Sequence, residues 1–418
     1  MRESSLILIL IFFLIGCERD KKKDARSLNV TFDDVRVVFS KHCISCHNAK
    51  GIAPIKLYNY DRIVKNKDLI KSAICNKLMP PYSADPKYSH FIEENVLSNH
   101  EKAIIISWVN EGCKKGQYSD VNLDSDSQGD TTINKADYSI VLSGSLRLDS
   151  ARDERFVIYK VNLNNDKPLL VNKFEFHPSN SKITHHAWLL IDSLISQTSS
   201  STNYIVSLLS SESNEFHMPF PYYQEQLLYV PGVNSISLSQ NTCYYIPKYA
   251  ILYVQIHLLN KIHSPNLSFR LNIFKSNNIE PQVVSIKNLE EDLLTEQLLI
   301  PPDSIKTITL KSKPLKKATV IYRLTPHMHL RGKSIWAFAT DGRDTIPLIK
   351  IDKWDFMWQY NYTFKKAILI PAGWVIYVAG TYDNTIYNPT NPVLPPQFVS
   401  YGIKSTDEML RMNYDYTQ

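Results

Sequence analysis

The sequence is poor in glycine, and after its N-terminus it has no apolar run long enough to span a bilayer. Only 12 of 418 residues are glycine, against 24 tyrosines and 16 phenylalanines. Because aromatic side chains suit the half-buried surface of strands, this composition favours β-structure. The net charge of +6 is spread over the chain, and no basic helix or stripe concentrates it. No nucleic-acid partner is therefore expected.

The long apolar run at the N-terminus predicts export. It extends from Leu6 to Ile15, which is short for a membrane helix and typical of a signal peptide. The run ends in Leu-Ile-Gly-Cys17, which resembles the bacterial lipobox. We therefore expect residues 1–17 to be a lipoprotein signal with Cys17 lipidated, and residues 18–26 to be a charged tether. A plain secretory signal with an incidental cysteine is the alternative.

Cys43-Ile-Ser-Cys46-His47 has the C-x-x-C-H spacing. Two thiols at this spacing can add to the two vinyl groups of one haem, with the following histidine beneath the iron as proximal ligand. A thioredoxin-like redox pair lacks its βαβ context here, and half a zinc site lacks a second C-x-x-C. A location in the cell envelope, anchored to a bacterial membrane and facing the periplasm or exterior, also suits covalent haem attachment.

Met79 is the expected sixth ligand of that iron. Its thioether lies well downstream of His47, in a loop that Pro80 and Pro81 keep out of helix. A core-filling role for this methionine, or ligation by His90 or His100, are the alternatives.

Amphipathic periodicity predicts helices over 32–40, 68–76 and 99–111. With Gly51-Ile-Ala-Pro54 and Met79-Pro-Pro, the segment resembles bacterial cytochrome c modules fused to larger enzymes. That resemblance implies a small all-α cytochrome c domain over residues 27–118 with one haem c. Cys75 and Cys113 lie in the same segment, either as a disulfide or as two buried thiols.

The pattern changes after a linker at residues 119–137, which is rich in Ser, Asp, Asn and Thr. From residue 138 onward, short alternating segments punctuated by Asn, Pro, Ser and Asp predict an all-β module. Three histidine groups stand out in it, and they are His185-His186, His257 and His327-Met-His329.

The strand period constrains these groups. Alternation places Tyr253, Gln255 and His257 on one face of a strand. His327 and His329 share a face with Cα atoms about 6.5 Å apart, so their rings can converge on one ion. The adjacent His185 and His186 point to opposite faces unless the backbone bulges there.

The three groups, in this order, resemble the copper type II monooxygenase family, which includes peptidylglycine α-hydroxylating and dopamine β-monooxygenases. The resemblance implies one copper on His185, His186 and His257. It implies a second copper on His327 and His329 with Met409, which lies in a matching Ser-Thr-Asp-Glu-Met segment. Tyr382-Asp-Asn384 and two later Asn-Pro pairs also resemble bacterial homologues. Met412 is a rival to Met409 if the register slips.

The ligand types agree with copper. The six candidates are neutral imidazoles and one soft thioether, which tolerate both Cu(I) and Cu(II), whereas zinc and non-haem iron sites often include a carboxylate. Zinc at the H-x-H pair, or no metal, are the alternatives. Thr325 stands where the peptide-hydroxylating relative has a basic residue, so a peptide substrate is not expected.

The expected fold is therefore a helical haem domain followed by two antiparallel β-sandwich subdomains of jelly-roll type, at residues 138–284 and 285–418. The resemblance implies a copper monooxygenase that hydroxylates a C–H bond of an unknown small molecule with O₂. His327, His329 and Met409 would be the catalytic ligands. The haem would relay electrons from a periplasmic donor. A non-enzymatic haem and copper electron-transfer protein, or a binding module that has lost its metals, are the alternatives.

Overall fold

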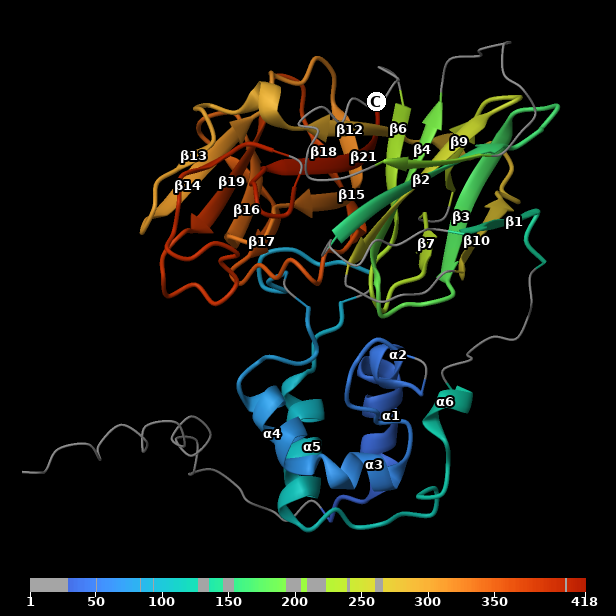
Figure 1. Cartoon of the computed structure of the whole chain (residues 1–418), viewed down its shortest axis with the longest axis vertical. Coiled ribbons are helices and arrows are strands. Elements are labelled where there is room, and N and C mark those ends of the chain that lie inside the picture. Colours follow the sequence, from blue (N-terminus) through green and yellow to red (C-terminus); the bar gives the residue numbers. More distant parts are fainter. Residues whose placement is uncertain are drawn as a thin grey trace, which may run out of the picture. The chain divides into compact units, whose positions relative to one another are not determined.

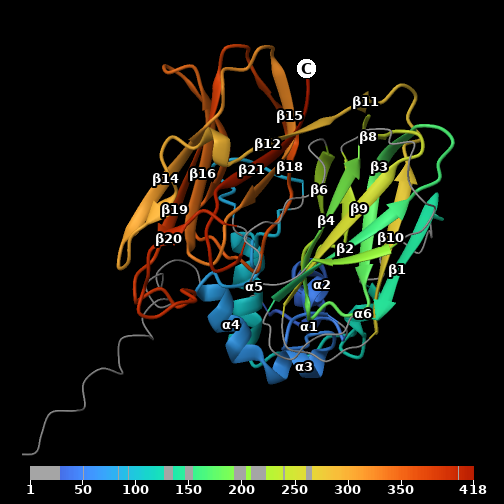
Figure 2. The same ribbon diagram turned by 45° about the horizontal axis from the view of Figure 1, so that its top comes forward.

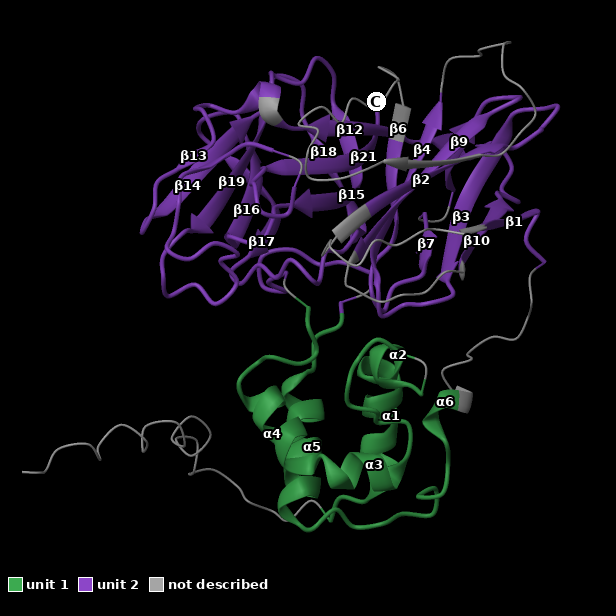
Figure 3. Ribbon diagram, viewed as in Figure 1, with its two compact units in different colours: residues 1–82, 95–133 green, residues 83–94, 134–418 purple. Residues whose placement is uncertain are grey.

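The computed structural model describes residues 29–49, 51–82, 84–92, 94–126, 135–145, 154–192, 204–208, 223–238, 241–259, 266–402 and 404–418. The lipobox with Cys17 lies outside these residues. The chain divides into two compact units (Figure 3). Unit 1 comprises residues 1–82 and 95–133, and unit 2 comprises residues 83–94 and 134–418. In the part of the chain described here, no helix is both long and apolar enough to cross a bilayer.

The described part of unit 1 folds mainly into helices (Figure 1). These are α1 (Phe32–His42), α2 (Ile44–His47), α3 (Tyr60–Lys65), α4 (Lys67–Cys75), α5 (Asn99–Asn110) and α6 (Leu123–Asp126). The three predicted helices are confirmed as α1, α4 and α5. Trp108 of α5 is fully buried and packs against Phe32 and Phe39 of α1. A capping box between Ser98 and Glu101 starts α5.

The N-terminal half of unit 2 contains two sheets. One has the order β1-β10-β3-β8-β11, with β7 paired to β3, and the other has the order β5-β2-β9-β4-β6. Their strands are β1 (Tyr138–Ser145), β2 (Glu154–Asn162), β3 (Leu169–Pro178), β4 (Thr184–Asp192), β5 (Tyr204–Leu208), β6 (Tyr223–Tyr229), β7 (Ser235–Ser237), β8 (Thr242–Ile246), β9 (Ile251–Leu259), β10 (Asn266–Lys275) and β11 (Gln282–Val283). Leu252, Val254 and Ile256 of β9 join Phe174 and Phe176 of β3 in one apolar core, which confirms the predicted alternation in β9.

The C-terminal half of unit 2 contains three further sheets, in the orders β12-β21-β15-β18, β14-β19-β16-β17 and β13-β20. Their strands are β12 (Ser285–Leu289), β13 (Leu299–Ile300), β14 (Ile305–Lys311), β15 (Thr319–His327), β16 (Gly332–Thr340), β17 (Thr345–Ile351), β18 (Tyr362–Ile370), β19 (Val375–Asp383), β20 (Val399–Ser400) and β21 (Arg411–Thr417). A short 3₁₀ turn, η1, covers Glu291–Leu293. Figure 2 shows β15, β18 and β21 side by side in this half.

The expected fold class is wrong. Of the residues that the structure describes, 43% are strand and 14% helix, and among them no all-α cytochrome domain is evident. Between α4 and α5 the chain leaves the helices: residues 83–94 belong to unit 2, where Ala84 bridges Ile351 and Phe91 bridges Phe364. Within the described residues the strands form five small sheets rather than two antiparallel sandwiches, and β8 and β11 pair in parallel.

Candidate metal centre

The strands β4 and β9 bring three histidines together. His186 of β4 lies directly opposite His257 of β9, and the register shifts between Thr184 and His186. This shift is the bulge that the adjacent pair requires, because it lets His185 turn to the same side as His186. All three side chains are buried, and their ligand atoms lie within 4.8 Å of one another. We call His185, His186 and His257 the three-histidine group.

The ring nitrogens in this group fit a metal ion. His185 Nδ1 and His186 Nδ1 are 2.9 Å apart. Two nitrogens that each lie about 2.0–2.1 Å from one ion would have this separation at a ligand–metal–ligand angle of about 90°. His185 Nε2 lies 3.1 Å from the Phe356 carbonyl oxygen, which can only accept. The proton of His185 is therefore on Nε2, and Nδ1 is unprotonated, as a metal ligand must be.

Burial keeps the His186 ring neutral. Desolvation lowers the pKa of His186 well below its ordinary value, and the neighbouring histidines lower it further. Only a neutral imidazole binds a metal, so this environment favours ligation. The His257 ring is fixed by Phe156 of β2, which stacks on it with centroids 4.2 Å apart.

The second histidine group lies at the end of β15. His327 is the last residue of the strand and His329 follows in the turn to β16, with ring centroids 5.1 Å apart and planes at 86°. We call these two residues the H-x-H pair. His327 Nδ1 is hydrogen-bonded to Gln359 Oε1, and His329 Nδ1 lies 3.3 Å from the Asp407 carbonyl oxygen. Both partners are oxygen acceptors, so Nδ1 is the donor in each ring and Nε2 is unprotonated.

Glu408 holds the turn that carries the H-x-H pair. Its carboxylate is fully buried and accepts the backbone N–H groups of His329, at 3.0 Å, and Arg331, at 2.6 Å. Burial raises the pKa of Glu408 to about 8, against the backbone donors and Arg331, which lower it. Sequence reasoning assigned this residue no role, although it lies inside the Ser-Thr-Asp-Glu-Met segment.

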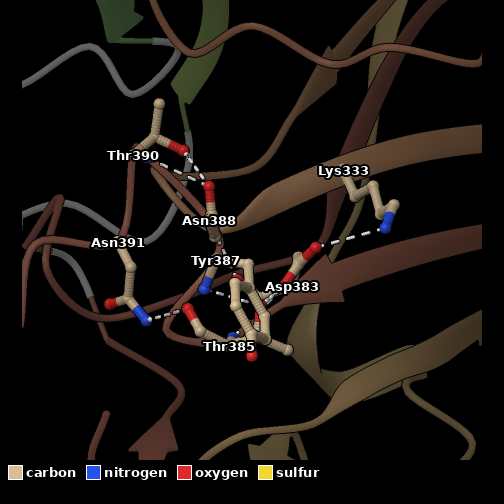
Figure 4. A network of polar contacts seen from close by, with 7 residues as sticks. All are labelled: Lys333, Asp383, Thr385, Tyr387, Asn388, Thr390 and Asn391. Atoms are coloured by element: carbon tan, nitrogen blue, oxygen red, sulfur yellow. Dashed lines mark hydrogen bonds and ion pairs between the residues drawn. The ribbon is translucent and has the colours of Figure 1, made fainter. Parts of the chain in front are cut away.

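The segment with the predicted Tyr382-Asp-Asn384 and Asn-Pro pairs is hydrogen-bonded to the same turn. Figure 4 shows Asp383 joined to Lys333, at 3.2 Å, and to Thr385. The backbone N–H of Thr390 donates to Asn388 Oδ1 at 3.0 Å, and its hydroxyl donates to the Leu330 carbonyl at 2.8 Å. Beside this network, the buried Arg331 guanidinium donates to Asn384 Oδ1 at 3.1 Å. These bonds tie the loop after β19 to the residues that follow the H-x-H pair.

The two histidine groups are close neighbours within unit 2. The rings of His186 and His327 have centroids 6.4 Å apart. The β17–β18 loop (residues 352–361) lies against both groups: the Phe356 ring stacks on His185 at 4.5 Å and meets His329 edge-on at 6.1 Å. The sequence carries no motif that identifies Phe356 or Gln359.

The two methionine candidates differ in position. Met409 directly follows Glu408, is half-buried, and has its carbonyl oxygen bonded by the Tyr382 hydroxyl at 2.8 Å. Met412 lies within β21 and pairs with Pro326, whereas His327 pairs with Arg411. Successive strand residues alternate faces, so Met412 is directed away from the face of His327. Met409 thus directly follows the residue that bonds the H-x-H turn, whereas Met412 lies on the opposite face of the sheet from His327.

The C-x-x-C-H residues lie in unit 1, around α2. His47 Nδ1 is 2.6 Å from the Ile55 carbonyl oxygen, which leaves Nε2 bare. Burial, and to a smaller extent the neighbouring Cys46, raises the pKa of the Cys43 thiol to about 12. A lowered pKa favours a redox-active or zinc-binding thiol, so this environment favours neither of those two alternatives. A Cβ on Gly51 would lie 2.1 Å from the Cys46 carbonyl oxygen, so only glycine fits there.

Two further predictions concern unit 1. Met79 follows α4 at a cis Met79–Pro80 bond, and 38% of it is exposed, so its sulfur is not committed to the core. Cys113 is a buried free thiol, and the disulfide between Cys75 and Cys113 is therefore not formed.

No family model matches the chain, and no curated protein is similar to it in sequence. Three solved structures align with it only loosely. The STIV MCP aligns at 10% identity with a TM-score of 0.25, over 68% of this chain and 92% of its own. Allantoicase aligns at 9% identity with a TM-score of 0.16, over 58% of this chain and 81% of its own. The VP2 subviral particle of infectious bursal disease virus aligns at 9% identity with a TM-score of 0.18, over 66% of this chain and 71% of its own.

Proposed function

We propose that the protein is a copper-dependent monooxygenase that hydroxylates a C–H bond of a small molecule with O₂ and receives electrons through a covalently attached haem. The observation that carries this proposal is the pairing of two buried histidine groups with opposite tautomers. In the three-histidine group, His185 offers Nδ1, whereas the H-x-H pair offers Nε2 from both rings. Two separately organised imidazole sites favour two metal ions over one.

The donor set supports copper as the metal. Within the two histidine groups, each ligand is an uncharged imidazole, and Met409 adds a thioether on the segment that Glu408 fixes. Such donors stabilise Cu(I) as well as Cu(II). Copper in these positions would supply one-electron redox chemistry and the activation of O₂.

The protein's own residues hold and shield these sites. The five histidines are each at least nine-tenths buried, which excludes bulk water from the ring nitrogens. Phe156 fixes the orientation of His257, and Glu408 fixes the backbone at His329. Thr325, where the peptide-hydroxylating relative has a basic residue, donates its hydroxyl to Asn361 Oδ1 at 2.6 Å. A substrate carboxylate would find no cation at that position.

The electron requirement gives unit 1 a role. Converting R–H and O₂ into R–OH and water takes two electrons and two protons. In this proposal Cys43 and Cys46 would attach the haem, and His47 Nε2 and Met79 would bind its iron. A haem carries one electron, so it would be reduced twice per turnover by a periplasmic donor. Lipidation at Cys17 would anchor the protein to the membrane where that donor is found.

A second candidate is a copper and haem electron-transfer protein without catalysis. The near-complete burial of all five histidines favours it, because a substrate must reach a metal site to be hydroxylated. The two candidates differ in one observable. An electron-transfer protein would bind copper but would show no oxygen consumption that depends on a substrate.

Oxygen uptake tests the proposal. The full chain, loaded with copper and haem and reduced, is mixed with O₂ and a panel of small C–H substrates, alongside a His327→Ala/His329→Ala double variant. We expect at least one substrate to accelerate both oxygen uptake and haem reoxidation in the wild type only. If the copper-loaded wild type consumes oxygen no faster than the double variant with every substrate, and reduced haem persists, the monooxygenase proposal fails.

A further inference from the structure

One backbone carbonyl, that of Phe356, lies between the two histidine groups. It accepts from His185 Nε2 at 3.1 Å and from Gln359 Nε2 at 2.9 Å. The other end of the same Gln359 amide, Oε1, is hydrogen-bonded to His327 Nδ1. A continuous chain of three hydrogen bonds therefore links a ring of the three-histidine group to a ring of the H-x-H pair.

The direction of each bond in this chain follows from the carbonyl. A carbonyl oxygen only accepts, so the amide nitrogen of Gln359 must face Phe356. Flipping the Gln359 amide would place its Oε1 against the Phe356 carbonyl oxygen, and two acceptors would then face each other. The amide oxygen must then face His327, and the proton between them must lie on His327 Nδ1. The same carbonyl requires the proton of His185 to lie on Nε2.

We infer that the Phe356 carbonyl sets the tautomer of one ring in each histidine group. It acts directly on His185 and through Gln359 on His327, and so determines which ring nitrogen is unprotonated. Gln359 is thus a positioning residue for the H-x-H pair. The use of the bare nitrogens as copper ligands rests on the proposed function, whereas the tautomers themselves do not. A partner that orients a ligating histidine typically changes metal affinity 10–100-fold when it is removed.

The loop that carries this carbonyl is fixed on both sides. Asn361 Nδ2 donates to the Leu227 carbonyl of β6 at 2.9 Å. The backbone N–H of Trp354 donates to the Lys333 carbonyl of β16 at 2.8 Å. Trp354 also packs over Gly332, where an added Cβ would lie 2.6 Å from its ring. The loop is therefore anchored on the strands next to each histidine group, which suits an element that sets both.

Nitrogen-15 NMR of the full chain with labelled histidines, in copper-free buffer, tests this inference. The compared variants are Gln359→Leu, Gln359→Glu and, as a matched control, Gln226→Leu. Gln226 is buried like Gln359, and its amide bonds the Leu227 carbonyl. We expect a protonated Nδ1 on His327 in the wild type and in the control, because each keeps an oxygen facing the ring. Gln359→Glu keeps this oxygen too when its buried carboxyl is protonated, because the O–H then donates to the Phe356 carbonyl in place of the amide N–H. We expect this signature to be lost in Gln359→Leu.

Copper titration of the same proteins supplies the second readout. Gln359→Leu should weaken one copper site 10–100-fold and leave the other unchanged. A wild-type His327 protonated on Nε2, or a Gln359→Leu spectrum and affinity equal to wild type, would overturn the inference. A wild type that shows the expected tautomers but binds no copper would sink the proposed function and leave the tautomer assignment standing.

Discussion

The three-histidine group is assembled by strand register, whereas the H-x-H pair is assembled by hydrogen bonds from loops. In the first, β4 and β9 pair so that His186 faces His257, and a bulge turns His185 to join them. In the second, only His327 lies in a strand, and Glu408 and Gln359 from distant segments hold the pair. Register depends on a whole sheet, but loop contacts depend on single side chains. The two groups should therefore fail in different ways when residues are removed.

Removing Glu408 should have the largest effect and should separate the two groups. Glu408→Ala leaves two buried backbone N–H groups without an acceptor, at a cost of roughly 1–3 kcal/mol each. We expect the free energy of unfolding to fall by about 2–5 kcal/mol and the H-x-H pair to lose its metal, while the three-histidine group keeps its own. Urea unfolding with copper analysis measures both.

Glu408→Gln is the matched control, because its amide oxygen keeps one of the two bonds. It should lose about half as much stability. An alanine variant as stable as the wild type would show that the turn is held by something else.

Removing one ligand of the three-histidine group should produce the converse result. His257→Ala deletes a ligand but leaves the β4–β9 pairing intact. We expect copper affinity at this group to fall at least about 100-fold, or about 2.7 kcal/mol, with the H-x-H pair unaffected. Chelator competition measures this, and His177→Ala, an exposed histidine on β3, is the control. Equal losses in both variants would contradict the assignment.

Phe356 separates the role of its ring from that of its carbonyl. The ring contacts both histidine groups, whereas the carbonyl belongs to the backbone and is kept in any substitution. Phe356→Leu removes one stacked and one edge-on aromatic contact, worth about 0.5–1.5 kcal/mol each. We expect both sites to weaken together by less than about tenfold, with the histidine tautomers unchanged. A change at only one site in copper titration would show that the loop does not serve both.

The smallest expected effect lies in unit 1 and should reach neither group. Burial raises the pKa of Glu101, but bonds from Ser98, His42 and Lys41 outweigh burial and lower the pKa to about 2. Because this pKa is depressed on folding, the stabilisation is present above about pH 4.5 and is lost as the pH falls towards 2. Glu101→Gln should therefore cost about 0.5–1 kcal/mol at pH 7 and almost nothing near pH 2.

Unfolding curves at the two pH values check the Glu101 effect, with Glu111→Gln, near the end of the same helix, as the control. A Glu101 loss that is equally large at both pH values would contradict the carboxylate's role.

The histidines themselves could be predicted from the sequence, because their spacing and the strand period are local. Alternation places Leu252, Val254 and Ile256 of β9 in the core and His257 on the other face, as found. The partners that set the tautomers could not be predicted. Gln359 lies 32 residues from His327, without a periodic or motif signal. Glu408, which holds the backbone of the turn, lies 79 residues from His329, and the Ser-Thr-Asp-Glu-Met segment around it points to Met409 and not to Glu408.

The fold class failed for the same reason. Local patterns locate helices and strands, but the grouping of strands depends on pairing between distant segments. Tyr138 in β1 pairs with Ile273 in β10, and Ser285 in β12 pairs with Tyr416 in β21. Ala84, from a segment between two helices, bridges Ile351. None of these pairings is visible in periodicity or turn residues.

The copper content of the purified full chain tests most directly whether the two histidine groups are separate metal sites. It is measured per protein and per haem after dialysis, beside the His327→Ala/His329→Ala double variant. We expect two coppers per chain in the wild type and one in the double variant, with one haem in each. A wild type that retains no copper, or a double variant that retains as much as the wild type, would contradict the claim that the two histidine groups are separate metal sites.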